Sequence, residues 1–338
     1  MAWYQVKGSE ADVVFSSRIR FARNLEGYPF GKRLDNNKAL EIIRRVGDAL
    51  GEDFTATDLT SLSPVGAQSL VEQHLISRDL AAAKGARTLF RNDSKSVFVM
   101  TPEEDHIRLQ CILPGLALQE AYRFACEADD KLDAALPLAF DERLGYLTHC
   151  PTNLGTGMRA SVMLFLPSLT ERGAIASLSH QLSKIGLTMR GMYGEGSKSY
   201  GCLYQVSNQV TLGLSEEEIL HKLEEAVQSI IRSERELRDS LTGEEAERRA
   251  DRLSRAEGVV RYATLLSSEE FFRLFAELKL GVSLGVIEGI SHEALSTLLI
   301  NALPATLSSN AADAPKDGMA RDRLRASFIK KALEVSKA

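Results

Sequence analysis

Three carboxylates stand side by side at the end of one apolar segment of the chain. In VFVMTPEEDHIRLQC, residues 97–111, a β-branched run is followed by Glu103, Glu104 and Asp105, with Arg108 three residues further on. Adjacent carboxylates repel one another unless a cation lies among them. They therefore indicate a site for a cationic substrate or a metal ion, with an arginine beside it.

Two further arginines alternate with apolar residues near the beginning of the chain. In SSRIRFARN, residues 16–24, Arg18 and Arg20 project from the same face of an extended segment, because successive strand side chains point opposite ways. Two guanidinium forks on one face suit phosphate oxygens. Taken alone, the pattern is more typical of an exposed basic face.

Two glycine-containing loops add an arginine each. CPTNLGTGMRAS, residues 150–161, places Arg159 at the start of a strand, but it lacks the Lys-Ser/Thr ending of a P-loop and is no dinucleotide fingerprint. MRGMYGEGS, residues 189–197, sets Arg190 at the end of a strand and Glu195 between two glycines. An ordinary turn is the alternative interpretation of each loop.

Taken together, these segments predict a binding site more specifically than any one of them does alone. Four segments each offer an arginine at or near a strand, and two of them also offer a carboxylate. A dry, empty site lined by so many guanidinium groups would be strongly repulsive, so the set predicts a polyanion such as a nucleoside triphosphate. The arginines are Arg18, Arg20, Arg108, Arg159 and Arg190.

The elements that must position these residues are short strands with interspersed helices, up to about residue 213. Several apolar runs are joined by loops too short for a crossover, which favours antiparallel pairing and an α+β fold. Helical periodicity predicts helices at 36–50, 65–82, 118–136 and 172–185.

After residue 213 the pattern changes to charged and apolar residues at helical spacing. We therefore expect two domains, one with the sheet at 1–213 and a helical one at 214–338. The last amphipathic helix is predicted at 321–335, after a polar, proline-containing segment.

Composition excludes several classes of protein. A chain of 338 residues with 44% hydrophobic and 26% charged residues can bury a large core. A net charge of −5 argues against general nucleic-acid binding. We expect a cytoplasmic protein, because no run of about 18 apolar residues and no signal peptide occurs. Its four cysteines lack CxxC spacing, which predicts no structural metal.

The motifs closely resemble those of the catalytic domain of phosphagen (guanidino) kinases. SSRIR, PEEDHIR, CPTNLGTGMR and RGMYGEGS followed by YQVSN occur in that family's order within residues 12–213, with Pro102 where the family's Asn-Glu-Glu-Asp box has asparagine. Those kinases carry a helical domain before this motif that encloses the small guanidino substrate, whereas SSRIR stands at residues 16–20 here, so we expect the enclosing domain to be missing. A helical C-terminal extension is present instead, and this arrangement is similar to that of bacterial protein arginine kinases.

The resemblance implies a role for each matching residue. Glu104 and Glu195 would bind the substrate guanidinium, and Cys150 would lie near it, where the alternative is an inert core cysteine. Glu103 and Asp105 would organise Mg²⁺ through water, with no direct metal ligand. The expected ATP-binding residues are Arg18, Arg20, His74, Arg108, Arg159 and Arg190.

The chemistry of arginine agrees with these roles. Its guanidinium has a pKa of roughly 12.5–13.8, so a proton must leave as the bond to phosphorus forms. Glu104 is suited to hold one nitrogen in line with the γ-phosphate and to accept that proton, while Glu195 fixes the other nitrogens.

The function implied by the resemblance is transfer of the ATP γ-phosphate to arginine side chains of proteins, which marks them for regulation or for degradation by a Clp protease. A kinase for free arginine or another small guanidino compound is the alternative, and a catalytically silent binding module is a third hypothesis. The implied partners are a second copy of the chain, the activator McsA, the repressor CtsR and ClpC–ClpP.

One motif lies far from these segments in sequence. In RDRLRA, residues 321–326, Arg321, Asp322 and Arg325 have helical spacing, which is typical of a solvated face with an intrahelical ion pair. The resemblance implies a different role, an allosteric site that binds phosphoarginine.

Overall fold

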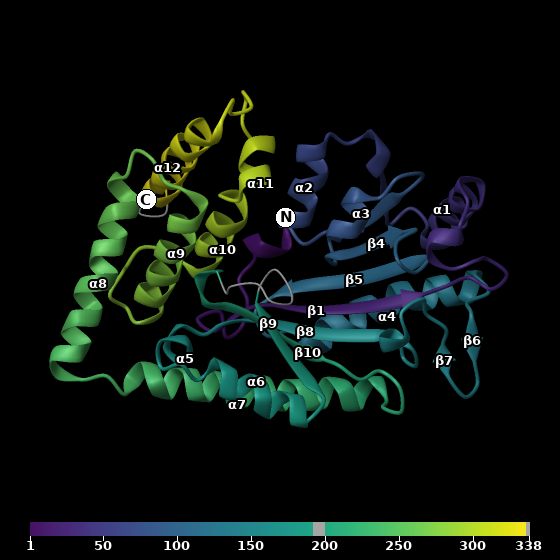
Figure 1. Ribbon diagram of the computed structural model, residues 1–338, viewed down its shortest axis with the longest axis horizontal. Coiled ribbons are helices and arrows are strands. Elements are labelled where there is room, and N and C mark those ends of the chain that lie inside the picture. The colour runs from purple at the N-terminus through teal and green to yellow at the C-terminus, as the bar shows by residue number, and fades with distance from the viewer. Residues whose placement is uncertain (192–199, 336–338) are drawn as a thin grey trace.

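The computed structural model describes residues 1–191 and 200–335 and is built around one large sheet (Figure 1). Eight strands lie in the order β2-β3-β4-β5-β1-β8-β10-β9, and the neighbouring pairs are antiparallel. The predicted α+β class with an antiparallel sheet is confirmed. The strands are β1 (Val14–Arg23), β2 (Thr55–Asp58), β3 (Thr88–Asn92), β4 (Val97–Thr101), β5 (Ile107–Pro114), β8 (Met158–Phe165), β9 (Leu187–Gly191) and β10 (Leu203–Asn208), with a separate pair β6 (Phe140–Asp141) and β7 (Gly145–Tyr146).

One face of the sheet is largely apolar and is covered by helices α1, α4, α6 and α7. Ile19, Leu109 and Val162 of the central strands are fully buried there, in a core shared with apolar residues of the helices. Because strand side chains alternate, Arg18, Arg20, Arg108 and Arg159 lie on the opposite face. Arg23 of β1 lies on the apolar face, where it is buried and pairs with Asp129 of α4 at 2.6 Å. The bounds of these helices are α1 (Asn36–Leu50), α4 (Leu118–Ala135), α6 (Ile175–Lys184) and α7 (Glu216–Asp239).

Local signals set the helix ends. Helix α1 has the predicted bounds, and the side chain of Asp35 caps it by accepting a hydrogen bond from the backbone N–H of Lys38 at 3.0 Å. The helix predicted at 172–185 instead follows a short α5 (Pro167–Glu171) and begins later, as α6 (Ile175–Lys184). Gly173, with φ +69°, separates the two.

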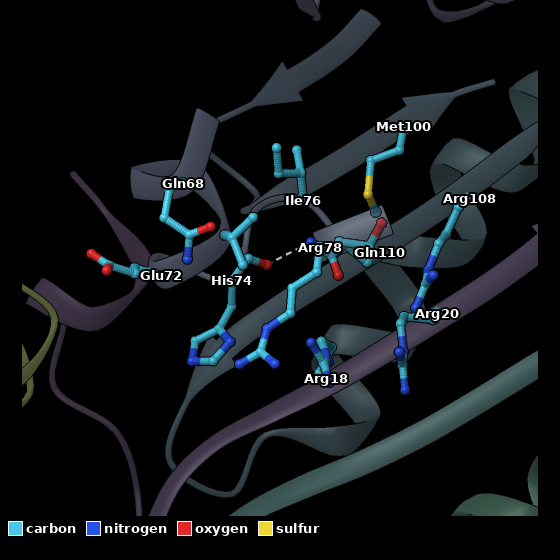
Figure 2. Close-up of a pocket in the computed structure, with 12 residues that line it drawn as sticks. Arg18, Arg20, Gln68, Glu72, His74, Ile76, Arg78, Met100, Arg108 and Gln110 are labelled. Carbon is cyan, nitrogen blue, oxygen red and sulfur yellow. Dashed lines mark hydrogen bonds between the residues drawn. The ribbon is translucent and has the colours of Figure 1, made fainter. Parts of the chain in front are cut away.

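The helix predicted at 65–82 is interrupted. It forms α2 (Pro64–Glu72) and α3 (Arg78–Ala82), because His74 adopts a left-handed conformation with φ 62° and Ser77 caps the second helix. The interruption turns His74 and the start of α3 toward the arginine face of the sheet, as Figure 2 shows for His74 and Arg78.

The remaining helices gather at one end of the molecule, beside α2 and the N-terminus (Figure 1). Their apolar residues share a second core with Trp3, Phe98 and Phe165. Helix α7 packs instead with the sheet, although it follows residue 213 in sequence. The helices of this end are α8 (Gly243–Tyr262), α9 (Ser268–Ser283), α10 (His292–Asn301), α11 (Pro304–Ser309) and α12 (Gly318–Val335).

Candidate active site

Strand register gathers the arginines on one face of the sheet. Arg20 of β1 lies opposite Arg159 of β8 on one side and Gln110 of β5 on the other. Arg108 lies two residues before Gln110 and so shares its face. Arg190 of β9 pairs with Gln205 of β10. Antiparallel pairing thus brings together arginines that are far apart in sequence.

A cavity of about 260 Å³ lies over this face (Figure 2). Figure 2 shows Arg18, Arg20 and Arg108 rising from the strands and Arg78 reaching toward them from the start of α3. Arg78 was not predicted as a site residue, because the sequence indicated one continuous helix at 65–82. The cavity is lined by Arg18, Arg20, Gln68, Val71, Glu72, His74, Ile76, Ser77, Arg78, Met100, Arg108 and Gln110.

The positive charges of the arginines in this cavity require an anion to balance them. Burial lowers the pKa of Arg18 to about 9, with Arg108 and Arg159 adding to the effect, and burial also lowers the pKa of Arg20 well below its usual range. The buried Nε of Arg20 has no hydrogen-bond partner. A polyphosphate would supply both the counter-charge and the acceptors, since planar guanidinium groups bind phosphate oxygens as bidentate donors.

His74 is placed beside the arginines as a neutral ring. Burial, reinforced by Arg18 and Arg78, lowers its pKa to about 3, and its Nε2 has no hydrogen-bond partner. Its backbone is fixed by Gln110, whose Nε2 donates to the His74 carbonyl at 2.8 Å. A neutral, buried imidazole with a free nitrogen suits the uncharged part of a nucleotide better than its phosphates.

The first carboxylate of the acidic loop binds two residues that line the arginine cavity, Arg108 and Ser77. Glu103 accepts two hydrogen bonds from Nη1 of Arg108, at 3.0 and 3.1 Å, and another from the hydroxyl of Ser77. Burial raises the pKa of Glu103, but Arg108, Ser77 and the N–H of Glu104 together lower it below its ordinary value. Glu103 is therefore ionised and fixes Arg108.

Glu104 is the exposed carboxylate of the three. It lines two cavities, one of about 230 Å³ shared with Arg20 and Arg159, and a larger one of about 790 Å³ bounded by the start of α1 and the segment 79–87. Burial, followed by repulsion from Asp105 and Glu103, raises its pKa. A carboxylate at this junction can bind a cationic group and accept a proton next to the phosphate cavity.

Asp105 is buried and connects two loops. Its Oδ1 accepts hydrogen bonds from Nδ2 of Asn24 at 2.7 Å and from the backbone N–H of His149 at 2.6 Å. These bonds hold the loop containing Cys150 against the acidic loop. The Cys150 sulfur lies 3.0 Å from the hydroxyl oxygen of Thr152, and Cys150 lines the 230 Å³ cavity together with Glu104.

The loop before Arg159 requires its glycines. A Cβ on Gly157 would lie 2.5 Å from Nη1 of Arg23 and 2.7 Å from the carbonyl oxygen of Ala22, and one on Gly155 would lie 2.4 Å from the carbonyl oxygen of Thr211. The close approach of these backbones, not a turn alone, explains the glycine pair. Arg159 itself donates from Nη2 to the hydroxyl of Ser207 at 3.0 Å.

Glu195 lies outside the described residues, in the segment between β9 and β10. Within residues 1–191 and 200–335, no group of three or more His, Cys, Asp or Glu residues is placed to hold a metal ion. In the same ranges no helix has both the length and the apolar character needed to cross a membrane.

The RDRLRA motif lies in the first turns of α12. Arg325 is fully buried, so a solvated face is wrong for this residue. Its Nε donates to the carbonyl of Ala302 at 2.9 Å, and its Nη1 donates to the carbonyl of Leu266 and to Asp322, each at 2.8 Å. The buried Nη2 of Arg325 and Nε of Arg321 have no hydrogen-bond partner.

Fold and site together define a phosphotransferase that acts on guanidino groups. A family model described as "ATP:guanido phosphotransferase, C-terminal catalytic domain" matches residues 39–237, and one described as "Protein-arginine kinase McsB C-terminal domain" matches residues 246–338. The chain belongs to the protein-arginine kinase family.

Relatives and solved structures agree with this assignment. The chain is 41% identical to the protein-arginine kinase of Moorella thermoacetica, over 98% of this chain and 97% of the relative. It is 42% identical to that of Desulforamulus reducens, over 98% and 95%. Lombricine kinase superposes with a TM-score of 0.60 at 26% identity, covering 70% of each chain. The duplicated taurocyamine kinase of Schistosoma mansoni gives 0.61 at 28%, covering 74% of this chain and 38% of that one.

Proposed function

We propose that this enzyme transfers the γ-phosphate of ATP to arginine side chains displayed on proteins. The observation that carries the proposal is the position of Glu104, an accessible carboxylate between the arginine-lined cavity and the much larger cavity of about 790 Å³. The larger cavity offers room for the chain that carries the arginine. The names of the relatives and the match to the C-terminal domain model support a protein acceptor over free arginine.

Binding of ATP is assigned to the arginine face. Arg18, Arg20 and Arg108, with Arg159 and Arg190 on the neighbouring strands, bind the phosphates, and His74 contacts the nucleoside. Arg108 is held by Glu103 and Arg159 by Ser207 before the substrate arrives. Donors fixed in this way stabilise charge on a transferring phosphoryl group most effectively.

Transfer requires one bond to form and one to break. A guanidinium nitrogen held by Glu104 attacks the γ-phosphorus, the bond from that phosphorus to the bridging oxygen breaks, and ADP leaves with the electron pair. Glu104 takes the proton released from the nitrogen. We assign Glu195 to the other guanidinium nitrogens and Cys150 to the wall beside them.

The acidic loop fits Mg²⁺ bound through water. Mg²⁺ in such sites keeps several waters and is held by substrate phosphates with one or two carboxylates. Glu103, Glu104 and Asp105 all line the cavity of about 230 Å³ shared with Arg20 and Arg159, and Asp105 is also bonded to Asn24 and His149. We assign Glu103 and Asp105 to the water molecules around the ion. Bound with ATP, the ion would neutralise charge on the phosphates.

A comparison of acceptors tests the proposal. With ATP and Mg²⁺, an unstructured arginine-containing protein is expected to be phosphorylated with a much higher kcat/KM than free arginine. The same protein with its arginines replaced by lysine serves as the control. Equal or faster phosphorylation of free arginine would instead favour a small-molecule guanidino kinase.

The rate should depend on pH through Glu104. Only the ionised carboxylate accepts a proton, and its pKa is raised before the guanidinium binds, so kcat/KM for the protein acceptor is expected to fall with decreasing pH at values above those of an ordinary glutamate, whose pKa is about 4.3. A pH profile of kcat/KM for the acceptor measures this, with nucleotide binding followed over the same range to detect unfolding. An acid limb at or below pH 4.3 would contradict the assignment.

We propose that the RDRLRA motif binds phosphoarginine. The unfilled donors on Arg321 and Arg325 suit a phosphoryl group with roughly two negative charges, and Asp322 can pair with the guanidinium part of the ligand. Arg325 also satisfies two buried carbonyls, so its removal would destabilise the helices around it. Arg321 therefore gives the cleaner test.

Arg321→Ala is expected to weaken phosphoarginine binding by roughly 10- to 100-fold, the loss typical of hydrogen bonds to a charged group. Titration calorimetry with free phosphoarginine measures this in a catalytically inactive Glu104→Gln background. Arg323→Ala, an exposed change on the same helix, is the matched control. Equal affinity in the Arg321 variant and the control would remove the motif from consideration as the sensor.

The roles of the two domains, the location in the cell and the partner proteins are proposed from the resemblance to the family. We assign catalysis to residues 1–213 and both dimerisation and phosphoarginine sensing to residues 214–338, and we propose that the enzyme acts in the cytoplasm with McsA, CtsR and ClpC–ClpP. Four cysteines without a disulfide accord with a reducing compartment.

A further inference from the structure

Helix α2, one wall of the nucleotide cavity, rests on the C-terminal helices. Gln68, Val71 and Glu72 of α2 line the cavity, and the helix packs against α11, more than 230 residues later in sequence. Figure 1 shows the two helices side by side near the N-terminus. The nucleotide cavity therefore depends on the C-terminal part of the chain for one of its walls.

Glu72 makes the strongest contact between the two helices. Its Oε1 accepts from the backbone N–H of Ala305 at 3.0 Å, and its Oε2 accepts from the N–H and the hydroxyl of Thr306, at 2.7 and 2.8 Å. Leu303, which precedes α11, supplies no side-chain cap, so Glu72 satisfies these buried N–H groups in its place. Figure 2 shows its carboxylate directed away from the arginines.

The other end of the same short segment holds the sensor arginine. The carbonyl of Ala302, three residues before Ala305, accepts the hydrogen bond from Nε of Arg325. Residues 302–306 thus contact the RDRLRA motif at one end and Glu72 at the other. The Glu72 carboxylate also contributes a favourable charge at Arg325, whose pKa is lowered chiefly by burial.

On the nucleotide side, Glu72 is two residues from His74. The chain between them is fixed by Trp3, whose Nε1 donates to the carbonyl of Gln73 at 3.1 Å, and by the Gln110 bond to the His74 carbonyl. Displacement of Glu72 would therefore move His74, which borders the nucleotide cavity.

We infer that Glu72 is a positioning residue that couples the phosphoarginine pocket to the nucleotide cavity through residues 302–306. The inference rests on the proposed sensing role of the RDRLRA motif. Coupling between two sites needs an element whose arrangement both ligands favour. Phosphoarginine would accept a hydrogen bond from the unfilled Nη2 donor of Arg325, and ATP would balance the charge of the arginines beside His74. Both ligands would favour the same arrangement of α2 and residues 302–306. Each ligand should therefore tighten the binding of the other.

The variant Glu72→Gln distinguishes a positioning role of Glu72 from a role in packing alone. Glutamine has the same size, but its amide cannot accept hydrogen bonds at both ends, so one N–H of α11 loses its partner. The variant is expected to raise KM for ATP about fivefold with a much smaller change in kcat. Thr306→Val, which removes one donor and keeps the carboxylate, should give a smaller shift in the same direction. Ser69→Ala is the matched control, since the Ser69 hydroxyl makes a 3.3 Å contact with the Thr306 hydroxyl and accepts a hydrogen bond from Nε2 of Gln73 at 3.0 Å, but it caps no backbone N–H of α11.

The decisive experiment measures the two ligands together on the full chain. In the Glu104→Gln background, calorimetry gives the Kd of phosphoarginine with and without a non-hydrolysable ATP analogue. With Glu72 present, the analogue should lower the Kd of phosphoarginine about fivefold or more, and phosphoarginine should lower the Kd of the analogue by the same factor. With Glu72→Gln added, both ligands should still bind, and the mutual effect should fall below about twofold.

The outcomes distinguish this coupling from the function on which it rests. The coupling through Glu72 would be overturned if the two ligands still tightened each other's binding in the Glu72→Gln protein, or if they did not do so in the protein with Glu72. Neither result would contradict phosphoarginine binding at the RDRLRA motif. Failure of phosphoarginine to bind at all would overturn both. Arginine phosphorylation by the parent enzyme is measured separately and depends on neither result.

Discussion

Replacement of Glu104 with glutamine is expected to reduce arginine phosphorylation by roughly 10²–10⁴-fold, the usual contribution of a general base. Glutamine keeps the size of the side chain but can neither accept the proton nor attract the guanidinium. Glu104 lies outside the 260 Å³ arginine cavity, so nucleotide affinity should change little. Single-turnover transfer and equilibrium nucleotide binding, measured on the same protein, give the two quantities.

Glu142→Gln is the matched control for this variant. Glu142 is exposed in the turn between β6 and β7 and lines none of the cavities around Glu104. The control should retain both transfer and nucleotide binding. Transfer by the Glu104 variant within about tenfold of the control would show that the proton is accepted elsewhere.

Arg159→Lys is expected to lower kcat/KM for ATP by about 10- to 100-fold although the charge is kept. An ammonium group cannot reproduce the planar fork of a guanidinium, and the loss corresponds to about one hydrogen bond to a charged group. Arg159 faces Arg20 across the sheet and donates to Ser207, so its fork is already oriented. A lysine would also lose that orientation.

Initial rates over a range of ATP concentrations measure this effect. Arg123→Lys on the outer surface of α4 provides the control, because Arg123 forms exposed ion pairs with Glu120 and Glu127, lies over the ring of Phe124 and lines none of the cavities at the site. If the two variants use ATP equally well, Arg159 has no part in phosphate binding.

The sequence predicted the elements whose signals are local. Helix α1 has the predicted bounds because Asp35 caps it, and the antiparallel sheet follows from loops too short for crossovers. The alternation of Arg18 and Arg20 correctly placed both on one face of β1. These features depend on residues within a few positions of one another.

Features that depend on distant contacts were not predictable in this way. The break between α2 and α3 needs a left-handed His74, which is fixed by Trp3 and Gln110 from elsewhere in the chain, and Arg78 was missed with it. Periodicity likewise could not show that Arg325 is buried, because its partners Leu266 and Ala302 come from the connections before α9 and after α10.

The carboxylates of the acidic loop show the same limit within a single motif. Three adjacent residues have three environments: Glu103 binds Arg108, Glu104 is accessible, and Asp105 is buried against Asn24 and His149. Their spacing indicated a site for a cation but could not separate these environments, since each one depends on a different loop.

The chemical identity of the product tests the central claim most directly. The purified enzyme is incubated with ATP, Mg²⁺ and an unstructured protein, and the product is examined by ³¹P NMR and by mass spectrometry under conditions that preserve acid-labile groups. The account predicts phosphorus bound to a guanidinium nitrogen of arginine, lost in acid and absent with the Glu104→Gln enzyme. Phosphate on a hydroxyl side chain, or phosphoarginine formed only from free arginine, would contradict it.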